Sequence, residues 1–594
     1  MPVEKTIRQV RKIFLDAFGV VDVGYLRKWL TIAILIGLVA GVASILFYMA
    51  IEGVTWLALG QGAGYFPPAA GGEGATIVSA ISRNWAIPLI CTLGGLLSGF
   101  MVFKWAPEAE GHGTDSAINA FHNKEGFIRK RIPPIKLVAS AITIGTGGSA
   151  GREGPVALIT AGFGSLIGDI FKLNSHDRRI AVAVGLGAGI GSIFKAPLGG
   201  ALLSAEILYR RDFEFEALLP SFIASIIGYS VFASWHGWEP IFSINTQFAF
   251  TRPEELLGYA LLGIACGLFG VAYGHTFYRM RDIFRGIKIP NIYKPAIGGL
   301  VVGVIGMFLP QILGTGYGWL QLAINGDFTT LPLGILIAVI FGKIAATALS
   351  VGSGGSGGVF APGLVVGGMV GAVSWSLLHH IGGIVPSDPA PFVVLGMMTL
   401  FGGIAKAPLA IMIMVSEMTG NYSLLVPSML SVVIAYVLTG RSFIYEKQVE
   451  TRAESPAHRM EYSVPLLDRI CICDAMVKRP VTITPKANLS KLSEVMQSKL
   501  VDAAVVVESR KLVGIVTTRD IARFSEDKWQ QVLVQDVMHK DLRVGYPDET
   551  LHQALKRMTK SNISHLPIVD KEKPDKLVGL LAVHNIAAMY DLQK

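Results

Sequence analysis

Two glycine-rich stretches decide the fold: GTGGSAGREGP at residues 145–155 and GSGGSGGVFAP at residues 352–362, with Glu153 in the first where Phe360 stands in the second. A glycine-rich segment that opens a helix leaves backbone N–H groups unpaired, and these groups and the helix dipole favour an anion. In hydrocarbon, such broken helices persist only where they line a protein cavity or a water-filled path. The alternative is that the glycines merely allow close helix packing. Because the stretch is repeated, we favour the anion site.

The composition is that of a membrane protein. Of 594 residues, 51% are hydrophobic and 16% are charged, and the mean hydropathy is +0.51; a soluble domain carries about 25% charged residues. Most of the apolar runs approach the ~20 residues that cross a bilayer. These runs are Trp29 to Tyr48, Ala86 to Phe103, Leu256 to Ala272, Leu333 to Leu349 and Leu425 to Leu438. The sequence therefore predicts a polytopic α-helical membrane protein.

Charge predicts the orientation. Basic residues precede the first apolar run and gather in three loops (124–136, 209–211 and 279–288), whereas residues 52–82 carry almost no charge. The positive-inside rule places the amino terminus and these loops in the cytoplasm. The expected location is therefore the cell (inner) membrane. The first run is too long for a cleaved signal peptide, so residues 1–27 are expected to be a cytoplasmic amphipathic segment. The formal net charge of +9 is accounted for by these loops and indicates no nucleic-acid partner.

A second pair of segments supports an internal repeat. KAPLGGALLSAE (195–206) is echoed by KAPLAIMIMVSE (406–417), 211 residues later, and Phe360 follows Glu153 by 207 residues. Nearly equal offsets indicate two related halves. Internal repeats are typical of transporters, whose ligand site lies between the halves near the membrane midplane.

Glu153 is the candidate gate. A carboxylate at membrane depth is costly unless it is paired, hydrated or protonated, so it is a functional hypothesis by default. Among anion-binding amides it can take the place of the anion, and it would be released when protonated. A structural ion pair with Arg152 is the alternative, disfavoured because neighbouring residues on a helix do not face each other.

The C-terminal part contains its own repeat. DAMVKRPVTITP begins at Asp474 and DVMHKDLRVGYP begins at Asp536, 62 residues later. Paired units of this length indicate a module with a shared core. We expect the membrane domain over 28–445, a linker over 446–468, and the two units over 469–531 and 532–594.

These motifs resemble the CLC family of chloride channels and chloride/proton exchangers. GREGP (151–155) resembles its gating-glutamate motif, GVFAP (358–362) its Gly-x-Phe-x-Pro motif and GHGTD (111–115) its first anion-binding loop; the tail resembles a pair of CBS domains. The resemblance implies two inverted repeats with re-entrant or broken helices, followed by a cytoplasmic α/β CBS pair. It also implies a homodimer with one anion pathway per subunit, embedded in the lipid membrane.

The resemblance further implies the site residues. Glu153 would be the outer gate and proton acceptor, and chloride or another small monovalent anion would be held at a set of positions from both halves. That set is His112, Gly113, Arg152, Gly154, Val359, Phe360, Ala361 and Tyr445. Many members have Ser at the position of His112, which can donate an N–H to the anion or cap the loop, and histidine titrates near physiological pH. For Tyr445 the alternative is an interfacial aromatic anchor.

One departure bears on the mode of transport. Where proton-coupled members commonly carry an inner glutamate, this chain has Ile207, which cannot carry a proton. This favours a channel gated by Glu153. The alternative is a proton-coupled Cl⁻/H⁺ antiporter that delivers protons through water or Glu206.

The CBS pair is a candidate nucleotide sensor. GIVTTRD matches the family's Gly-x-x-Ser/Thr-x-x-Asp pattern at Gly514, Thr517 and Asp520, with Thr518 beside them, whereas the second unit departs at Ala582 and Asn585. One site for an adenosine nucleotide (ATP, ADP or AMP) is expected, although no cofactor is required. A structural dimerisation module without a ligand is the alternative.

Other classes of protein fit less well. A metal transporter would need intramembrane carboxylate clusters, but Glu153, Asp169, Glu206 and Glu417 are dispersed along the sequence. Cys471-x-Cys473 lacks the spacing of a zinc site, so no metal site is expected. H-E-x-x-H is absent, and no nucleophile–base pair presents itself. We expect a chloride transport protein and not an enzyme.

Overall fold

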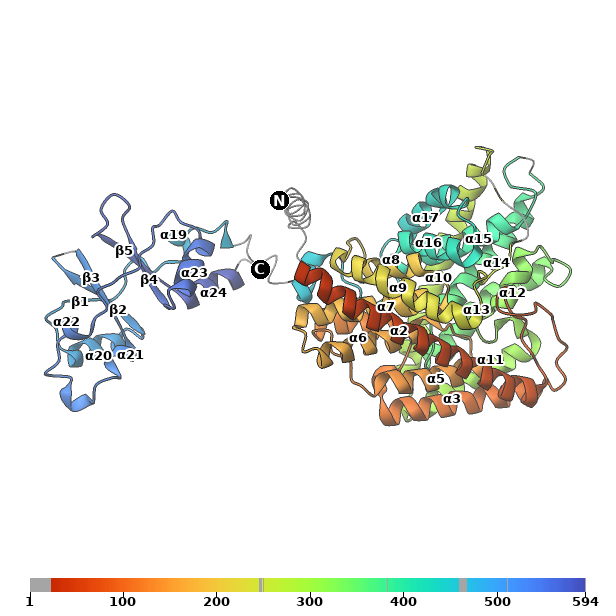
Figure 1. Ribbon diagram of the computed structural model, residues 1–594, viewed down its shortest axis with the longest axis horizontal. Helices are drawn as coiled ribbons and strands as arrows, with labels where there is room; N and C mark the ends of the chain where they lie inside the picture. The colour runs from red at the N-terminus through yellow and green to blue at the C-terminus, as the bar shows by residue number, and fades with distance from the viewer. Residues whose placement is uncertain are drawn as a thin grey trace, which may run out of the picture. The chain divides into compact units, whose positions relative to one another are not determined.

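A computed structural model describes residues 23–244, 248, 250–381, 383–458, 467–509 and 511–592 (Figure 1). The chain divides between Ala457 and His458 into two compact units. The amphipathic segment predicted over 1–27 lies mostly outside the described residues, because the first described helix begins at Val23.

The first unit is built of helices in two halves. The first half contains α2 (Val23–Thr55), its continuation η1 (Trp56–Ala63), α3 (Ala86–Trp105), η2 (Pro107–Ala109), α4 (Thr114–Asn123), α5 (Ile132–Gly145), α6 (Glu153–Ile170), α7 (Ser175–Ile193), α8 (Pro197–Glu206) and α9 (Phe215–His236). The second half contains α10 (Glu255–Gly286), η3 (Asn291–Tyr293), α11 (Lys294–Phe308), η4 (Pro310–Ile312), α12 (Tyr317–Ile324), α13 (Leu333–Gly352), α14 (Phe360–Leu378), α15 (Ala390–Ala405), α16 (Pro408–Thr419) and α17 (Leu425–Thr439). Each predicted apolar run lies within one helix.

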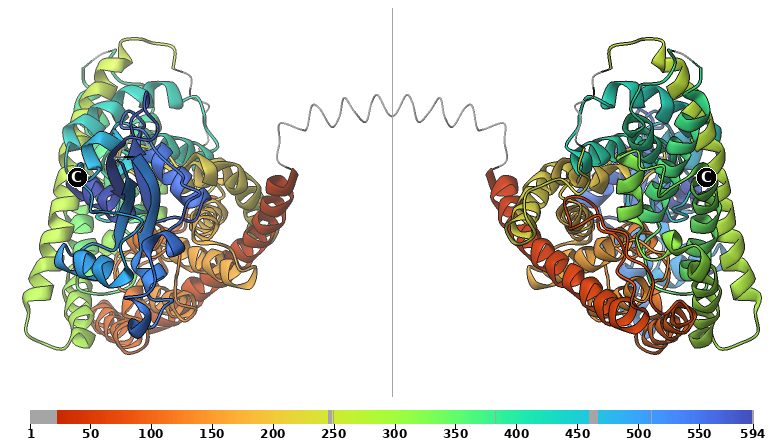
Figure 2. Two further views of the ribbon diagram at one scale, coloured as in Figure 1. Left: turned by 90° about the vertical axis from the view of Figure 1, so that its left-hand side faces the viewer. Right: turned by 90° about the vertical axis from the view of Figure 1, so that its right-hand side faces the viewer.

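Seven helices of the described residues are long and apolar enough to cross a membrane. Four shorter apolar helices of the described residues, α5, α15, α16 and α17, belong to the same unit. The long helix α2 runs obliquely across the right-hand view of Figure 2 and packs on α7 and α9. The unit is therefore a bundle that combines helices of full membrane-spanning length with shorter ones.

The helices break at the two glycine-rich stretches. α5 ends at Gly145 and α6 begins at Glu153; α13 ends at Gly352 and α14 begins at Phe360. A proline occupies the third position of each new helix, where its missing N–H leaves no hydrogen bond unmade. α8 and α16 each begin at the proline of Lys-Ala-Pro-Leu, a residue that suits the first position of a helix.

The two halves hold each other through reciprocal contacts. Gly151 N–H donates to the Gly358 carbonyl and Gly358 N–H donates to the Gly151 carbonyl, both at 2.7 Å. Buried Lys136 donates to the carbonyls of two residues that precede α4, and buried Lys343 donates in the same way to two residues that precede α12. Each contact thus has a counterpart in the other half, as two related repeats require.

The second unit, around residues 467–592, is α/β. Its strands form one sheet in the order β1 (Thr482–Ile483), β2 (Ala503–Glu508), β3 (Lys511–Thr517), and a second sheet of β4 (His565–Val569) and β5 (Leu577–Ala582). The helices are α19 (Ile472–Ala475), α20 (Leu489–Ser498), α21 (Thr518–Ile521), α22 (Val534–Val537), α23 (Leu551–Lys560) and α24 (Val583–Leu592). β2 pairs with β1 in parallel and with β3 antiparallel. α20 and α23 begin 62 residues apart, the spacing of the sequence repeat.

Candidate anion pathway

Glu153 is the first residue of α6 and is 1% exposed. Its Oε1 accepts a hydrogen bond of 2.9 Å from the hydroxyl of Tyr317, the first residue of α12. The carboxylate lies against the Gly151–Gly358 pair, where a side chain on Gly151 would collide with Oε2. The candidate gate therefore stands where the glycine-rich stretches of both halves meet.

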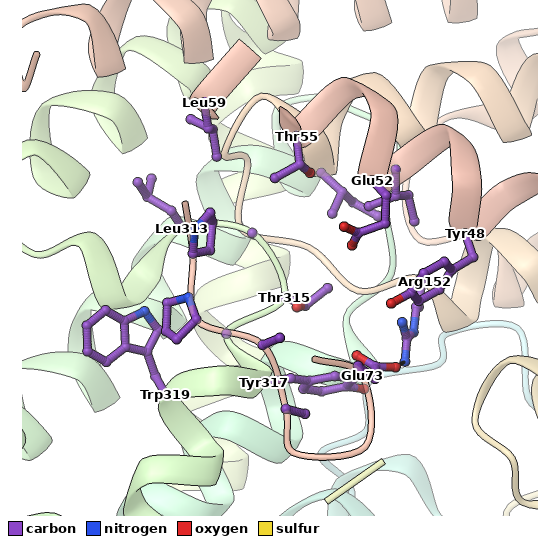
Figure 3. Close-up of a pocket in the computed structure, with 18 residues that line it drawn as sticks. Tyr48, Glu52, Thr55, Leu59, Glu73, Arg152, Leu313, Thr315, Tyr317 and Trp319 are labelled. Carbon is purple, nitrogen blue, oxygen red and sulfur yellow. Dashed lines mark hydrogen bonds and ion pairs between the residues drawn. The ribbon is translucent and has the colours of Figure 1, made fainter. Parts of the chain in front are cut away.

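Arg152 does not pair with Glu153. Its guanidinium forms an ion pair with Glu73, from the segment that links η1 and α3 (Figure 3). The guanidinium carbon also lies 5.3 Å from the ring centroid of Tyr48 and 5.4 Å from that of Tyr317, within the range of a cation–π contact. The alternative role considered for Glu153, an ion pair with its neighbour, is absent from this geometry.

The second glycine-rich stretch lies beside the first. The Val359 carbonyl accepts a 2.6 Å hydrogen bond from Tyr273. The ring of Phe360, on the first residue of α14, lies 4.5 Å between centroids from Phe401, which lies 6.4 Å from Tyr445. Ala361 follows on the same helix turn and is fully buried.

The GHG loop packs directly on the start of α6. A side chain on Gly154 would collide with the His112 carbonyl oxygen, and Gly113 has φ +86, a conformation that glycine adopts readily. The His112 ring lies 5.5 Å from the Tyr445 ring, and its Nε2 lies 3.2 Å from the carboxylate of Asp115. Tyr445 is only 2% exposed, so its ring lies inside the protein.

The inner glutamates form a reciprocal pair of helix caps. The Glu206 carboxylate accepts hydrogen bonds from the N–H groups of Leu409 (3.2 Å) and Ala410 (2.7 Å) at the start of α16. The Glu417 carboxylate accepts from the corresponding N–H groups of Leu198 (3.0 Å) and Gly199 (2.7 Å) at the start of α8. Carboxylates stabilise helix amino termini. Glu206 is thus engaged with backbone amides of the opposite half.

Ile207 is buried and directly follows α8. Its carbonyl accepts a 3.0 Å hydrogen bond from Gln448, which also binds the Ala405 carbonyl. Residues 446–457, predicted as part of a linker, pack on the helical unit here: Arg210 and Arg211 N–H groups donate to the carbonyls of Val449 and Glu450.

Four residues near the site were not identified from the sequence. Tyr317 lies in GTGYG (314–318), which stands 203 residues after GHGTD, so the repeat offers a signal for it. Glu73 and Gln448 carry no such signal. Nor does Glu214, a fully buried carboxylate that accepts a 2.7 Å hydrogen bond from Tyr209. Their roles depend on contacts distant in sequence.

The C-terminal unit contains a cleft of 440 Å³ between its two repeats. Thr517, Thr518 and Asp520 line it, whereas Gly514 lies on β3 against the Met538 side chain. Burial alone would raise the pKa of Asp520, but hydrogen bonds from the Thr517 backbone and hydroxyl, and from His539, hold that pKa below its usual value. In the second repeat, Asn585 accepts from the Ala582 N–H in the same way.

Cys471, Cys473 and Asp474 lie together at the surface. Their potential ligand atoms all lie within 4.8 Å of one another. The sequence predicts no metal site, and this prediction remains open, because a partly exposed trio of this kind also occurs without an ion.

The fold and the site define a polytopic membrane protein with two related halves whose broken helices meet at a buried glutamate. The family described as "Voltage gated chloride channel" matches residues 94–440, and CBS domains match residues 472–527 and 534–590. The chain belongs to this CLC family. The CLC fold with its C-terminal CBS pair, predicted from the sequence, is confirmed, and chloride transport in a membrane is its class of function.

Relatives and solved structures agree with this assignment. An uncharacterised protein of Methanocaldococcus jannaschii is 30% identical over 70% of this chain and 95% of its own length. The H⁺/Cl⁻ exchange transporter ClcA of Klebsiella pneumoniae is 29% identical over 61% of this chain and 78% of its own. The crystal structure of a slow cyanobacterial Cl⁻/H⁺ antiporter matches 70% of this chain and 96% of its own with a TM-score of 0.62 and 25% identity.

Proposed function

We propose that chloride crosses the membrane through the space in which Glu153 stands, and that Glu153 gates this pathway. The observation that carries the proposal is the position of its carboxylate. It lies buried at the junction of the two glycine-rich stretches, bound by the Tyr317 hydroxyl. The anion would be held by the residues around it: His112, Gly113, Arg152, Gly154, Val359, Phe360, Ala361 and Tyr445.

We propose passive, channel-like conduction. The position at which proton-coupled relatives carry an inner glutamate is Ile207, and the neighbouring Glu206 caps α16. A carboxylate bound by two amides of the opposite half is poorly placed to shuttle a proton. Neither residue therefore supplies a proton-transfer group on the inner side.

The second candidate is a Cl⁻/H⁺ antiporter. It is favoured by the names of the relatives, one an exchange transporter and one an antiporter. In this mode protons would reach Glu153 through water or through Glu206. The two modes make opposite predictions for proton movement.

The remaining proposals concern assembly. We propose a homodimer in the inner membrane with the amino terminus and tail in the cytoplasm, where the basic loops lie. The proposed domains are 1–27, 28–445, a linker 446–468, 469–531 and 532–594. The first part of that linker is held against the helical unit.

We also propose that the CBS pair binds one adenosine nucleotide. The cleft of 440 Å³ carries Arg519, Arg523 and Arg543 beside Asp520. Cationic side chains suit phosphate, and a carboxylate can accept hydrogen bonds from both ribose hydroxyls. ATP, ADP and AMP titrations of the full chain would test this proposal; in all three, Asp520→Ala should abolish the heat of binding.

Chloride efflux from proteoliposomes tests the gate. Glu153→Gln removes the charge that competes with the anion, so we expect faster efflux without the dependence on pH shown by the unchanged protein. Glu254→Gln, at an exposed acidic position before α10, is the matched control and should behave as the unchanged protein. Efflux through Glu153→Gln that keeps the original rate and pH dependence would refute the gate.

A further inference from the structure

A cavity of 140 Å³ lies beside the gate, at the carboxyl-terminal end of α2 (Figure 3). Tyr48, Glu52, Glu73, Arg152 and Tyr317 line it among others. Glu52 is exposed, so the cavity reaches the surface of the helical unit. By the distribution of basic loops this is the outer side of the membrane.

Arg152 is the buried cation of this cavity. It is 4% exposed, and its Nε has no hydrogen-bond partner among the described residues. Aromatic rings of Tyr48, Phe194 and Tyr317 surround the guanidinium carbon at 5.3, 5.9 and 5.4 Å. A guanidinium buried to this extent requires a compensating anion. The surroundings of Arg152 therefore favour a bound anion.

The anion that fills the site is a carboxylate of the chain itself. Glu73 comes from the segment between η1 and α3, and forms the ion pair with Arg152. Two adjacent backbone groups fix this segment: Gly72 N–H donates to the Ile241 carbonyl at 2.9 Å, and Gly71 N–H donates to Gln321 Oε1 at 3.1 Å. Glu73 is thus a tethered anion, presented by a loop that binds the opposite half.

Tyr317 connects this cavity to the gate. Its ring lines the cavity and contacts the guanidinium, while its hydroxyl donates to Glu153. Arg152 and Glu153 are also consecutive in sequence. An anion on Arg152 would therefore lie next to the gate on the outer side.

We propose that the Arg152 guanidinium is an outer docking site for chloride, and that Glu73 occupies it as a tethered competitor. Chloride arriving from outside must displace Glu73 to dock, so the loop restrains inward anion movement. This inference rests on the proposed chloride function. It goes beyond that proposal by assigning the anion to the Arg152 guanidinium, outside the gate, and by naming Glu73 as its competitor.

The test is anion binding, measured separately from transport. Crystals of Glu73→Gln, grown in bromide, should show anomalous density at the Arg152 guanidinium that crystals of the unchanged protein lack. Glu52→Gln neutralises a carboxylate of the same cavity that does not pair with Arg152, and should show no such density. Absence of bromide in Glu73→Gln would overturn the proposal, as would bromide on Arg152 while Glu73 is still paired.

Flux supplies the second readout. A cleft lined by one sign of charge raises the association rate of an oppositely charged ion by about tenfold or more. Glu73→Gln leaves Arg152 as such a charge, so it should lower the external chloride concentration for half-maximal uptake by about tenfold. The double variant Glu73→Gln/Arg152→Gln should lose this gain. If both Glu73→Gln and Glu73→Ala fail to fold, Glu73 is a structural partner and the proposal is wrong. If no variant moves chloride, the proposed function fails. The bromide density would still show whether Arg152 binds an anion when Glu73 is neutralised.

Discussion

At the scale of single residues, the sequence identified the repeated glutamates but not what they bind. Glu206 and Glu417 occupy equivalent positions of the Lys-Ala-Pro-Leu segments, which predicts a shared role. In the structure Glu206 caps α16 and Glu417 caps α8. These contacts depend on how the two halves pack and could not be predicted from the sequence. The same holds for Glu73, whose partner Arg152 is 79 residues away.

The reciprocal caps predict matched losses of stability. In Glu206→Gln or Glu417→Gln the NH₂ of the new side chain faces one of the two backbone N–H donors and cannot accept its hydrogen bond. The free energy of unfolding of each variant should therefore fall by about 1–3 kcal/mol. Thermal unfolding in detergent, followed by circular dichroism, should give similar falls in melting temperature for the two. Transport would keep its proton independence in both. A specific change in proton movement in Glu206→Gln alone would instead assign that residue to proton delivery.

The hydroxyl of Tyr317 predicts how firmly the gate is held. Tyr317→Phe removes the hydrogen bond to Glu153, worth about 1 kcal/mol, and should speed chloride efflux about fivefold. Tyr436→Phe removes a hydroxyl that donates to the Arg210 carbonyl instead, and should leave efflux unchanged. Slower efflux in Tyr317→Phe would mean that the hydroxyl assists the anion and does not restrain the gate.

At the scale of elements, apolar runs and glycine–proline signals predicted the long helices and the breaks before α6 and α14. The short helices α4 and α12 could not be predicted, since eight to ten residues carry too little periodicity. The sequence left two roles open for its glycines, an anion site and close helix packing, and the structure contains glycines in both kinds of position. A side chain on Gly367 would collide with the Gly396 carbonyl across α14 and α15, which is close packing, whereas a side chain on Gly151 would collide with the carboxylate of the candidate gate, Glu153.

Glycine at the start of α6 predicts a sharp contrast. Gly154→Ala places a methyl group into the His112 carbonyl, and should destabilise the unit by about 3 kcal/mol or more. Gly53→Ala, in α2, meets no heavy atom within 4 Å, and should be neutral or more stable by up to about 1 kcal/mol. Size-exclusion chromatography in detergent should find Gly154→Ala aggregated and Gly53→Ala monodisperse. Equal behaviour would show that α6 can move away from the loop.

At the scale of the whole molecule, the chain joins a membrane unit to an α/β unit with a repeat of its own. The apolar runs predicted the membrane unit, and the 62-residue repeat predicted the C-terminal unit. The packing of residues 446–457 on the membrane unit was not predictable, because a polar segment gives no sign of a specific partner such as Gln448 with the Ile207 carbonyl.

The two CBS repeats predict an asymmetric response to acid. Asp520 has a pKa below its ordinary value of 3.8, so its stabilisation is complete above that value and is lost as the pH falls through the depressed pKa. Pepsin digestion of the full chain should become faster in the C-terminal unit between about pH 4 and pH 2, and Asp520→Asn should remove that dependence. Asn585→Asp should add to it. If digestion of Asp520→Asn kept the pH dependence of the unchanged protein, Asp520 would not be the group responsible.

The most direct test of the whole account is proton movement in proteoliposomes that hold a steep chloride gradient, no pH gradient and a potential clamped with valinomycin. With Ile207 at the inner position, chloride should leave while the external pH stays constant. Uphill proton movement that disappears in Glu153→Gln would contradict passive conduction and establish an antiporter.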